Sequence, residues 1–164
     1  MRWMHGVMLF TAGTVLGIFA AQPSAAPQDK TVGIRLNHFG LYVKSLDESL
    51  NFYTKTMGFR EAFQIKDKDG NPVLAYLQIS RDTFVELAPA TADHPAGISH
   101  LGLWSDDLNK TVAVLRERGL KMDDPRTLST KSPLTNIFDP GGVRLELLEY
   151  PPESLQRKAM EGWK

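Results

Sequence analysis

Cysteine is absent from the 164 residues of this chain. Disulfide bonds, thiolate metal ligands and a cysteine nucleophile are therefore excluded, and any bound metal must be held by nitrogen and oxygen atoms. The sequence also lacks an excess of charge, because 19 Lys and Arg residues balance 19 Asp and Glu residues. Without a basic patch or a run of like charge, nothing indicates a protein that binds nucleic acid.

Long hydrophobic runs are missing as well. The most apolar stretch is the 16-residue uncharged run at residues 6–21, which follows a basic start at Arg2 and precedes small residues up to Ala26. A bilayer-spanning helix needs about 20 apolar residues, whereas a shorter run before small residues is typical of a signal peptide. We interpret residues 1–26 as a signal peptide of an exported, periplasmic or secreted protein. A retained anchor is the alternative, and after cleavage we expect no stable membrane insertion.

An internal repeat organises the rest of the chain. When the sequence is shifted by 62 residues, LNHFGLY at residues 36–42 aligns with ISHLGLW at residues 98–104. Both segments precede a helical pattern that ends at a glycine. Such self-similarity is a sign of a duplicated structural unit.

Each half of the repeat has the pattern of one strand, one helix and three short strands. Ser45 and Glu48 have capping-box spacing at the start of a helix over residues 45–56, and Gly119 marks the end of a helix over residues 105–118. Apolar runs between turn residues predict strands at 59–66, 73–80 and 83–88, and at 120–122, 134–138 and 143–149.

The predicted fold class is therefore α+β, built from two tandem βαβββ modules. The modules span about residues 33–89 and 97–150 and together form one domain, 33–150. A segment rich in proline and alanine between them is the natural boundary. We expect residues 151–164 to form a short C-terminal tail helix.

Two histidines and two glutamates occupy equivalent positions in the two halves. His38 and His100 lie in the first strand of their modules, and Glu86 and Glu146 lie in the last strand, 48 and 46 residues later. Side chains alternate between the two faces of a strand. The four residues therefore point away from the face whose side chains pack against the helices. A carboxylate in an apolar strand is costly to bury unless it is paired or bound to a cation.

These four residues predict a site for one divalent metal ion. Imidazole nitrogen and carboxylate oxygen suit Zn, Ni, Co, Fe or Mn, and an octahedral ion would keep one or two positions for water or substrate. A single strand histidine is more often a hydrogen-bonded structural residue, and a single strand glutamate more often faces solvent. The matched positions in both halves favour the metal site over these separate explanations, whereas His5 and His94 fall outside the pattern.

Three motifs occur in order along the chain: NHFGL at residues 37–41, NFY at 51–53 followed by GF at 58–59, and DPGGVRLEL at 139–147. Together they resemble the vicinal oxygen chelate superfamily of glyoxalase I, bleomycin resistance proteins and extradiol dioxygenases, closest to its glyoxalase-I-like branch. The resemblance covers residues 33–150. It implies curled mixed sheets around a metal cleft, and an ion that chelates neighbouring substrate oxygens and stabilises an enolate.

The His, Glu, His, Glu set is similar to that of the isomerase and lyase branch, whereas ring-cleaving dioxygenases typically use two His and one Glu. The resemblance thus implies a metal-dependent isomerase or lyase that converts a small oxygenated substrate through a metal-stabilised enediolate. Glu146 is the first choice for the base and Glu86 the second. The alternatives are an Fe(II)-dependent extradiol-type dioxygenase, a non-catalytic small-molecule-binding or resistance protein of the same fold, and a purely structural exported protein.

The substrate is predicted less well than the branch. In bacterial glyoxalase I, glutathione is held by an Arg four residues after the first His and an Asn four residues after the first Glu, and these positions are Tyr42 and Ala90 here. Glutathione use is therefore in doubt. Arg144 would either bind an anionic substrate or pair with a carboxylate. The expected partners are a small-molecule substrate and a second copy of the chain in a homodimer. The residues that we expect to line the cleft are Tyr42, Tyr76, Trp104, Asn136 and Arg144.

Overall fold

The computed structural model describes residues 32–164. The predicted signal peptide, residues 1–26, lies outside this range. In residues 32–164, no helix is long and apolar enough to cross a membrane. The elements follow in the order β1 (Arg35–Val43), α1 (Leu46–Asn51), η1 (Phe52–Thr56), β2 (Arg60–Lys66), β3 (Pro72–Ser80), β4 (Thr83–Pro89), β5 (Gly97–Trp104), α2 (Leu108–Glu117), β6 (Arg126–Thr127), β7 (Pro133–Phe138), β8 (Arg144–Leu148) and α3 (Leu155–Glu161).

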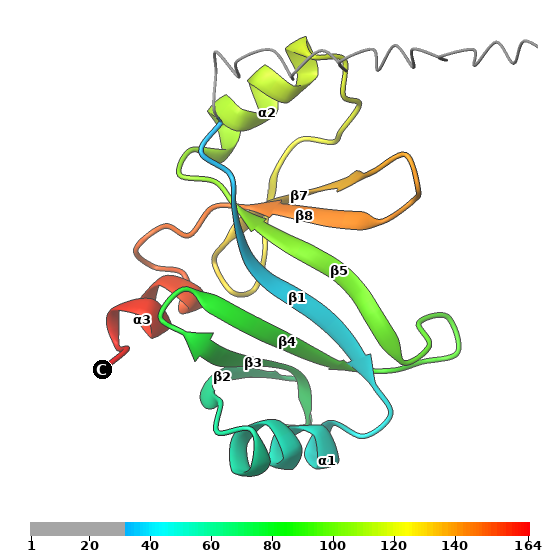
Figure 1. The fold of residues 1–164 in the computed structure, drawn as a ribbon, viewed down its shortest axis with the longest axis vertical. Coiled ribbons are helices and arrows are strands. Elements are labelled where there is room, and N and C mark those ends of the chain that lie inside the picture. The colour runs from blue at the N-terminus through cyan, green and yellow to red at the C-terminus, as the bar shows by residue number, and fades with distance from the viewer. Residues whose placement is uncertain (1–31) are drawn as a thin grey trace, which may run out of the picture. The chain divides into compact units, whose positions relative to one another are not determined.

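The strands of both halves join into one curled eight-stranded sheet with the order β2-β3-β4-β1-β5-β8-β7-β6. The first strands of the two modules, β1 and β5, pair antiparallel at its centre. Each of them pairs parallel with the last strand of its own module, β4 or β8. The predicted α+β fold with a curled mixed sheet is confirmed. Because β1 and β5 pair at the centre, the strand pairs β1–β4 and β5–β8, which carry the predicted metal ligands, lie side by side (Figure 1).

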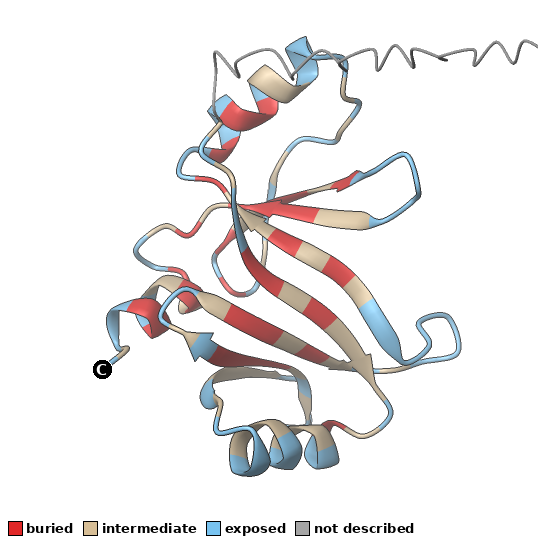
Figure 2. Ribbon diagram, in the orientation of Figure 1, coloured by how far each residue is buried: buried red, intermediate tan, exposed pale blue. Residues whose placement is uncertain are grey.

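One face of the sheet is covered by the module helices, as the strand alternation predicted. Leu87 of β4 packs with Leu46 of α1, and Leu147 of β8 packs with Leu108 of α2. Buried positions alternate with less buried ones along the central strands (Figure 2). Each fully buried leucine of this kind contributes about 1.5–3 kcal/mol to folding, so the packing fixes which side chains point to the opposite face.

The C-terminal helix α3 lies on the opposite face and joins the two modules. Its Met160 belongs to a cluster that contains Tyr76 and Phe84 of the first module and Leu148 of the second. Ser154 caps the helix by accepting a hydrogen bond from the amide of the third residue beyond it. The helix therefore holds the two halves of the sheet in a fixed relation.

The end of the first helix differs from the prediction of one regular helix over residues 45–56. Ser45 caps it as expected, but after Asn51 the helix widens into the π-helical turn η1. There the Met57 amide donates to the Phe52 carbonyl, five residues back. Gly58 then adopts a left-handed φ of 74°, which stops the helix.

The strand predicted at residues 120–122 is wrong. That segment forms no strand in the described part of the chain, and the edge strand β6 is Arg126–Thr127 instead. The apolar character of the segment has another cause, because Met122 packs beneath α2 against the cluster of Leu108 and Val112. The helix over residues 105–118 also starts later than expected, since Asp107 is its N-cap.

Candidate metal centre

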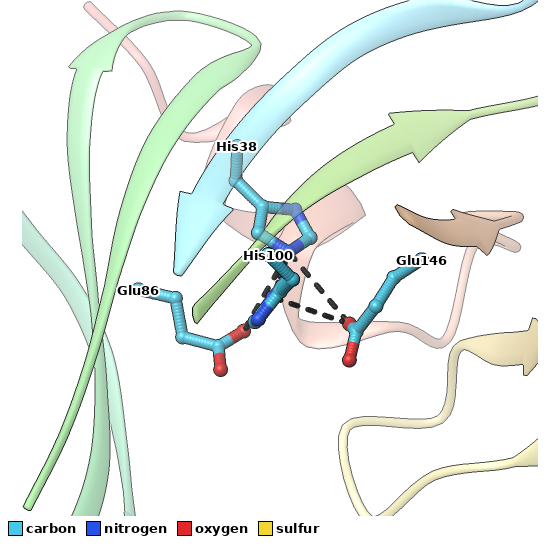
Figure 3. Close-up of side chains that lie close together, drawn as sticks. All are labelled: His38, Glu86, His100 and Glu146. Atoms are coloured by element: carbon cyan, nitrogen blue, oxygen red, sulfur yellow. Dashed lines mark hydrogen bonds and ion pairs between the residues drawn. The ribbon is translucent and has the colours of Figure 1, made fainter. Parts of the chain in front are cut away.

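The side chains of His38, Glu86, His100 and Glu146 point toward one another (Figure 3). By strand alternation they lie on the face of the sheet opposite the module helices. They come from the neighbouring strands β1, β4, β5 and β8. One ligand atom from each residue lies within 4.8 Å of the others. Both imidazoles are buried, whereas the two carboxylates keep 14% and 12% of their side-chain surface accessible. The cluster is thus reached from solvent on its carboxylate side.

The four donor atoms lie at distances that fit one divalent ion. The two Nε2 atoms of His38 and His100 are 3.1 Å apart. The distances from these nitrogens to the nearest Glu86 and Glu146 oxygens range from 3.4 to 3.9 Å. Ligand atoms around an ion with bonds of about 2.0–2.2 Å are roughly 3–4 Å apart, so the residues present fit a site built from nitrogen and oxygen.

Two glycines provide the space for the imidazole rings. On the antiparallel strands β1 and β5, His38 lies opposite Gly102 and His100 lies opposite Gly40. A Cβ atom added at Gly102 would lie 2.0 Å from Cε1 of His38, and one added at Gly40 would lie 2.1 Å from Cε1 of His100. Any other residue at these positions would displace the rings, so the H-x-G sequence in both halves is a geometric requirement of the cluster.

Asn37 and Tyr150 orient the His38 ring. The Nδ1 atom of His38 is 3.1 Å from Oδ1 of Asn37, which also accepts a hydrogen bond of 2.6 Å from the Tyr150 hydroxyl. Because an amide oxygen only accepts, Nδ1 carries the proton and Nε2 presents its lone pair to the cluster. Burial, partly opposed by Glu86, lowers the pKa of His38 from 6.5 to about 4. The ring is therefore neutral at neutral pH, the form that can bind a metal ion.

His100 has different neighbours. Nη2 of Arg144 donates to Nδ1 of His100 over 2.8 Å, and the Ser99 hydroxyl lies 2.5 Å from the same nitrogen. Since a guanidinium only donates, this Nδ1 acts as an acceptor and the neutral ring carries its proton on Nε2. That proton points to Nε2 of His38. A cation at Nε2 of His100 would require the tautomer with the proton on Nδ1, and once Arg144 is displaced the Ser99 hydroxyl is placed to accept a hydrogen bond from that Nδ1–H.

The two carboxylates are held differently. The Tyr76 hydroxyl donates a short hydrogen bond to Oε2 of Glu86. Burial alone would raise the pKa of Glu86, but its interactions with His100, His38 and Tyr76 outweigh burial and lower it. The pKa of Glu146 is raised, because burial and repulsion from Glu86 outweigh the attraction of His100 and Arg144. Of the two, Glu146 is the stronger base.

The residues expected to line the cleft are placed in several ways. Tyr76 is buried and donates a hydrogen bond to Glu86. Arg144 forms an ion pair with Glu146 over 3.3 Å, which is one of the two roles predicted for it from the sequence. Asn136 lies directly opposite Glu146 on β7, and its Oδ1 is buried without a hydrogen-bond partner in residues 32–164. Tyr42 packs on the ring of His94, with centroids 4.9 Å apart.

The placement of Trp104 in the cleft stays a prediction. Its ring lies at the C-terminal end of β5 and packs against Arg35, Arg157 and Tyr150. Alternation along the strand gives Trp104 the same face as His100. Four residues of strand separate Trp104 from His100 by about 13 Å, whereas Gly102, two residues before Trp104, lies opposite His38.

Several residues of the cluster were not singled out from the sequence as functional. Asn37, Ser99 and Tyr150 contact the outer nitrogens of the two histidines. The sequence contained one signal for two of them, because Asn37 and Ser99 each directly precede a histidine of the repeat. Tyr150 had no such signal, since it reaches Asn37 across 113 positions of the chain.

Comparison with known proteins places this geometry in context. The sequence model of the Glyoxalase/Bleomycin resistance protein/Dioxygenase superfamily matches residues 35–147. A probable chloroplastic lactoylglutathione lyase of Arabidopsis thaliana is 30% identical over 127 residues, which are 72% of this chain and 36% of that protein. The chain thus spans about a third of the length of this relative.

Two solved structures of methylmalonyl-CoA epimerases have a similar fold. The Mycobacterium tuberculosis epimerase has a TM-score of 0.62 and 24% sequence identity, covering 72% of this chain and 89% of that one. The Streptomyces coelicolor epimerase in complex with 2-nitronate-propionyl-CoA has a TM-score of 0.61 and 24% identity, covering 73% and 96%. At these identities the likeness concerns the fold.

Proposed function

Because this chain belongs to the glyoxalase/bleomycin resistance protein/dioxygenase superfamily, we propose that it is a metal-dependent isomerase or lyase of the glyoxalase type that acts on a small oxygenated compound. The observation that carries the proposal is the convergence of two imidazoles and two carboxylates within 4.8 Å on one face of the sheet. His38, Glu86, His100 and Glu146 would hold one divalent ion. Such an ion, when bound, supplies Lewis-acid stabilisation of negative charge on substrate oxygen atoms.

Glu146 is the proposed base. Its carboxylate accepts the proton next to the substrate carbonyl and returns it to the neighbouring carbon. Three features suit it to this role: its raised pKa, its partial exposure, and a partner, Arg144, that lies at the edge of the cluster. Glu86 is less free to move because Tyr76 holds its Oε2. Glu86 is therefore proposed mainly as a ligand.

Arg144 and Asn136 are the proposed contacts for the rest of the substrate. Both lie beside Glu146, and the guanidinium of Arg144 is partly exposed. Asn136 offers a buried amide oxygen without a partner among the described residues. A substrate donor would satisfy this amide oxygen, and an anionic group would attract Arg144 away from His100.

The decisive experiment is to remove and restore the metal. The protein is stripped with a chelating resin and reloaded separately with Zn, Ni, Co, Fe or Mn, while melting temperature and turnover of small 2-oxoaldehydes and 2-hydroxy ketones are measured. We expect stripping to abolish turnover and to lower the melting temperature by several degrees, and one ion to restore both. A protein indifferent to stripping and reloading would overturn the proposal.

Two variants separate this proposal from its alternatives. Glu86→Gln removes a ligand in the four-ligand site, so activity and metal content should both fall. An Fe(II) oxygenase with three protein ligands would tolerate that change and consume oxygen with catechols. A stoichiometric metal without turnover of any compound would indicate a binding protein instead. Glu146→Gln should abolish proton exchange whichever ion is bound.

Export and assembly remain predictions. The signal-peptide pattern of residues 1–26 supports the proposal that the domain acts outside the cytoplasm. The mass of the chain recovered from the periplasm or the medium tests it, since cleavage near Ala26 would shorten the chain. Light scattering of the purified protein tests the predicted homodimer.

A further inference from the structure

A cavity of about 240 Å³ lies on the structure away from the metal centre. It is open to solvent and is lined by residues from the start of β1, the turn between β3 and β4, the end of β5 and the helix α3. Three arginines line it, Arg35, Arg81 and Arg157. We call it the arginine cavity.

The positive charges of the arginine cavity are only partly neutralised. Arg35 forms an ion pair with Asp106. By contrast, neither Arg81 nor Arg157 forms a salt bridge within residues 32–164, although Asp82 and Glu161 also line the cavity. Guanidinium groups gathered in one cavity repel each other unless an anion lies between them, so two unpaired arginines here point to an anionic ligand.

Two of the three arginines, Arg35 and Arg157, pack against the Trp104 ring in the wall of the cavity. The Arg35 guanidinium lies 4.0 Å from the centre of the Trp104 ring, and that of Arg157 lies 5.3 Å from it. Nε of Arg157 also donates to the Tyr150 carbonyl over 3.0 Å. These contacts leave its terminal nitrogens available and reduce the side-chain entropy that would be lost on binding a ligand.

We propose that the arginine cavity binds a small organic anion through carboxylate or phosphate oxygen atoms, with Arg81 and Arg157 as its charged contacts. Planar guanidinium groups match both kinds of oxyanion in bidentate geometry. The apolar surfaces of Trp104 and the buried Met160 contact the carbon part of the ligand. The cavity volume sets the size, since it equals about eight water molecules.

This site is separate from the metal centre but borders its supporting residues. The fully buried Tyr150 packs on Trp104 on one side and donates to Asn37 on the other. The backbone carbonyl of Asp82 accepts a hydrogen bond of 2.6 Å from the Asn37 side chain. The metal ligands do not line the cavity, so anion binding does not require the ion.

Calorimetric titration of the full-length protein tests the proposal. Protein freed of metal on a chelating resin is titrated with benzoate, phenyl phosphate and inorganic phosphate, and the indole N–H signal of Trp104 is followed by NMR. We expect saturable binding of at least one organic anion with a shift of this signal. The carboxylate and phosphate arms distinguish the two chemistries, and inorganic phosphate shows whether the carbon part contributes.

Arg81→Gln is the main variant because the Arg81 guanidinium forms no hydrogen bond or ion pair in the described residues. It should weaken binding roughly tenfold or more, as expected for loss of a charge-assisted hydrogen bond. Arg116→Gln is the matched control, since Arg116 is an exposed arginine on α2 that pairs with Asp124, and it should leave binding unchanged. Absence of saturation at millimolar anion, or equal weakening by both variants, would overturn the proposal.

Discussion

Gly40 and His100 face each other across the central strand pair so closely that a Cβ atom on Gly40 would lie 2.1 Å from the imidazole. The same relation joins Gly102 and His38. The two imidazoles can meet at the centre of the sheet only because each lies over a residue without a side chain. The geometry of the candidate metal centre therefore depends on the β1–β5 pairing as much as on its four proposed ligands.

Gly40→Ala should displace the His100 ring. We expect the variant to lose divalent-metal affinity by at least about tenfold and to unfold with about 1–3 kcal/mol less free energy, because the added methyl group overpacks a buried site. Isothermal titration with Zn and chemical denaturation measure the two effects. Gly141→Ala is the control, since the nearest atoms to its added Cβ belong to the exposed Asp139 side chain. Equal metal affinity of the two variants would contradict the expected role of Gly40.

Tyr150→Phe should weaken metal binding although Tyr150 is not one of the proposed ligands. The Tyr150 hydroxyl donates a hydrogen bond to Oδ1 of Asn37, and the same oxygen accepts a hydrogen bond from Nδ1 of His38. Loss of a hydrogen bond of this kind beside a ligand typically costs 10–100-fold in metal affinity and about 1 kcal/mol in stability. Metal titration checks the first effect and thermal unfolding the second.

The matched control is Tyr53→Phe. Tyr53 stacks on Phe59 beneath α1, and within residues 32–164 its hydroxyl has no hydrogen bond. It should leave metal affinity unchanged. If the Tyr150 variant bound metal as tightly as this control, Asn37 would hold the His38 ring without help.

Arg144→Gln should tighten divalent-metal binding. The guanidinium is a fixed positive charge beside the site, and it occupies Nδ1 of His100, which keeps a proton on the inner nitrogen. Removing this charge lowers the repulsion of an incoming cation, and we expect roughly a tenfold gain in affinity. Competition titration against a chromophoric chelator measures it, with Arg116→Gln as the control. Weaker binding would mean that Arg144 is needed to hold Glu146 in place.

The stability of the metal-free protein should depend on pH through His38. The unfolded chain binds a proton at this residue near pH 6.5, whereas the folded chain does so only near pH 4. As the pH falls from 6.5 towards 4, the unfolded state gains a proton that the folded state lacks, so the free energy of unfolding decreases. The total decrease is on the order of 3 kcal/mol.

His38→Gln should lack this component, and His94→Gln, at an exposed position, should retain it. Urea denaturation of the three metal-free proteins across this pH range gives the comparison. The raised pKa of Glu146 has the opposite effect on the free energy of unfolding. The folded chain binds a proton at Glu146 more tightly than the unfolded chain, so this contribution to stability is present at low pH and is lost as the pH rises. The difference between wild type and His38→Gln reports the histidine together with the part of the Glu86 pKa shift that His38 causes. Parallel profiles would show that His38 is not the group responsible.

Much of the fold was predictable because local patterns and the repeat agree. Ser45 caps its helix as the capping-box spacing indicated, and the strand alternation placed Leu87 and Leu147 beneath the helices. The π-helical end of the first helix and the position of β6 were not predictable. For β6 the reason is that Met122 is used to cover α2, a contact between separate elements that local propensity does not encode.

The sequence by itself determined which side chains share a face, because alternation along a strand is a local property of the backbone. From the repeat it also determined that His38, Glu86, His100 and Glu146 form an equivalent set. Only the tertiary structure decided which of the residues on that face meet. The antiparallel register of β1 and β5 brings His100 to His38 and leaves Trp104 beside Arg35 and Arg157. That register depends on packing between residues far apart in the chain, and this packing has no local signal.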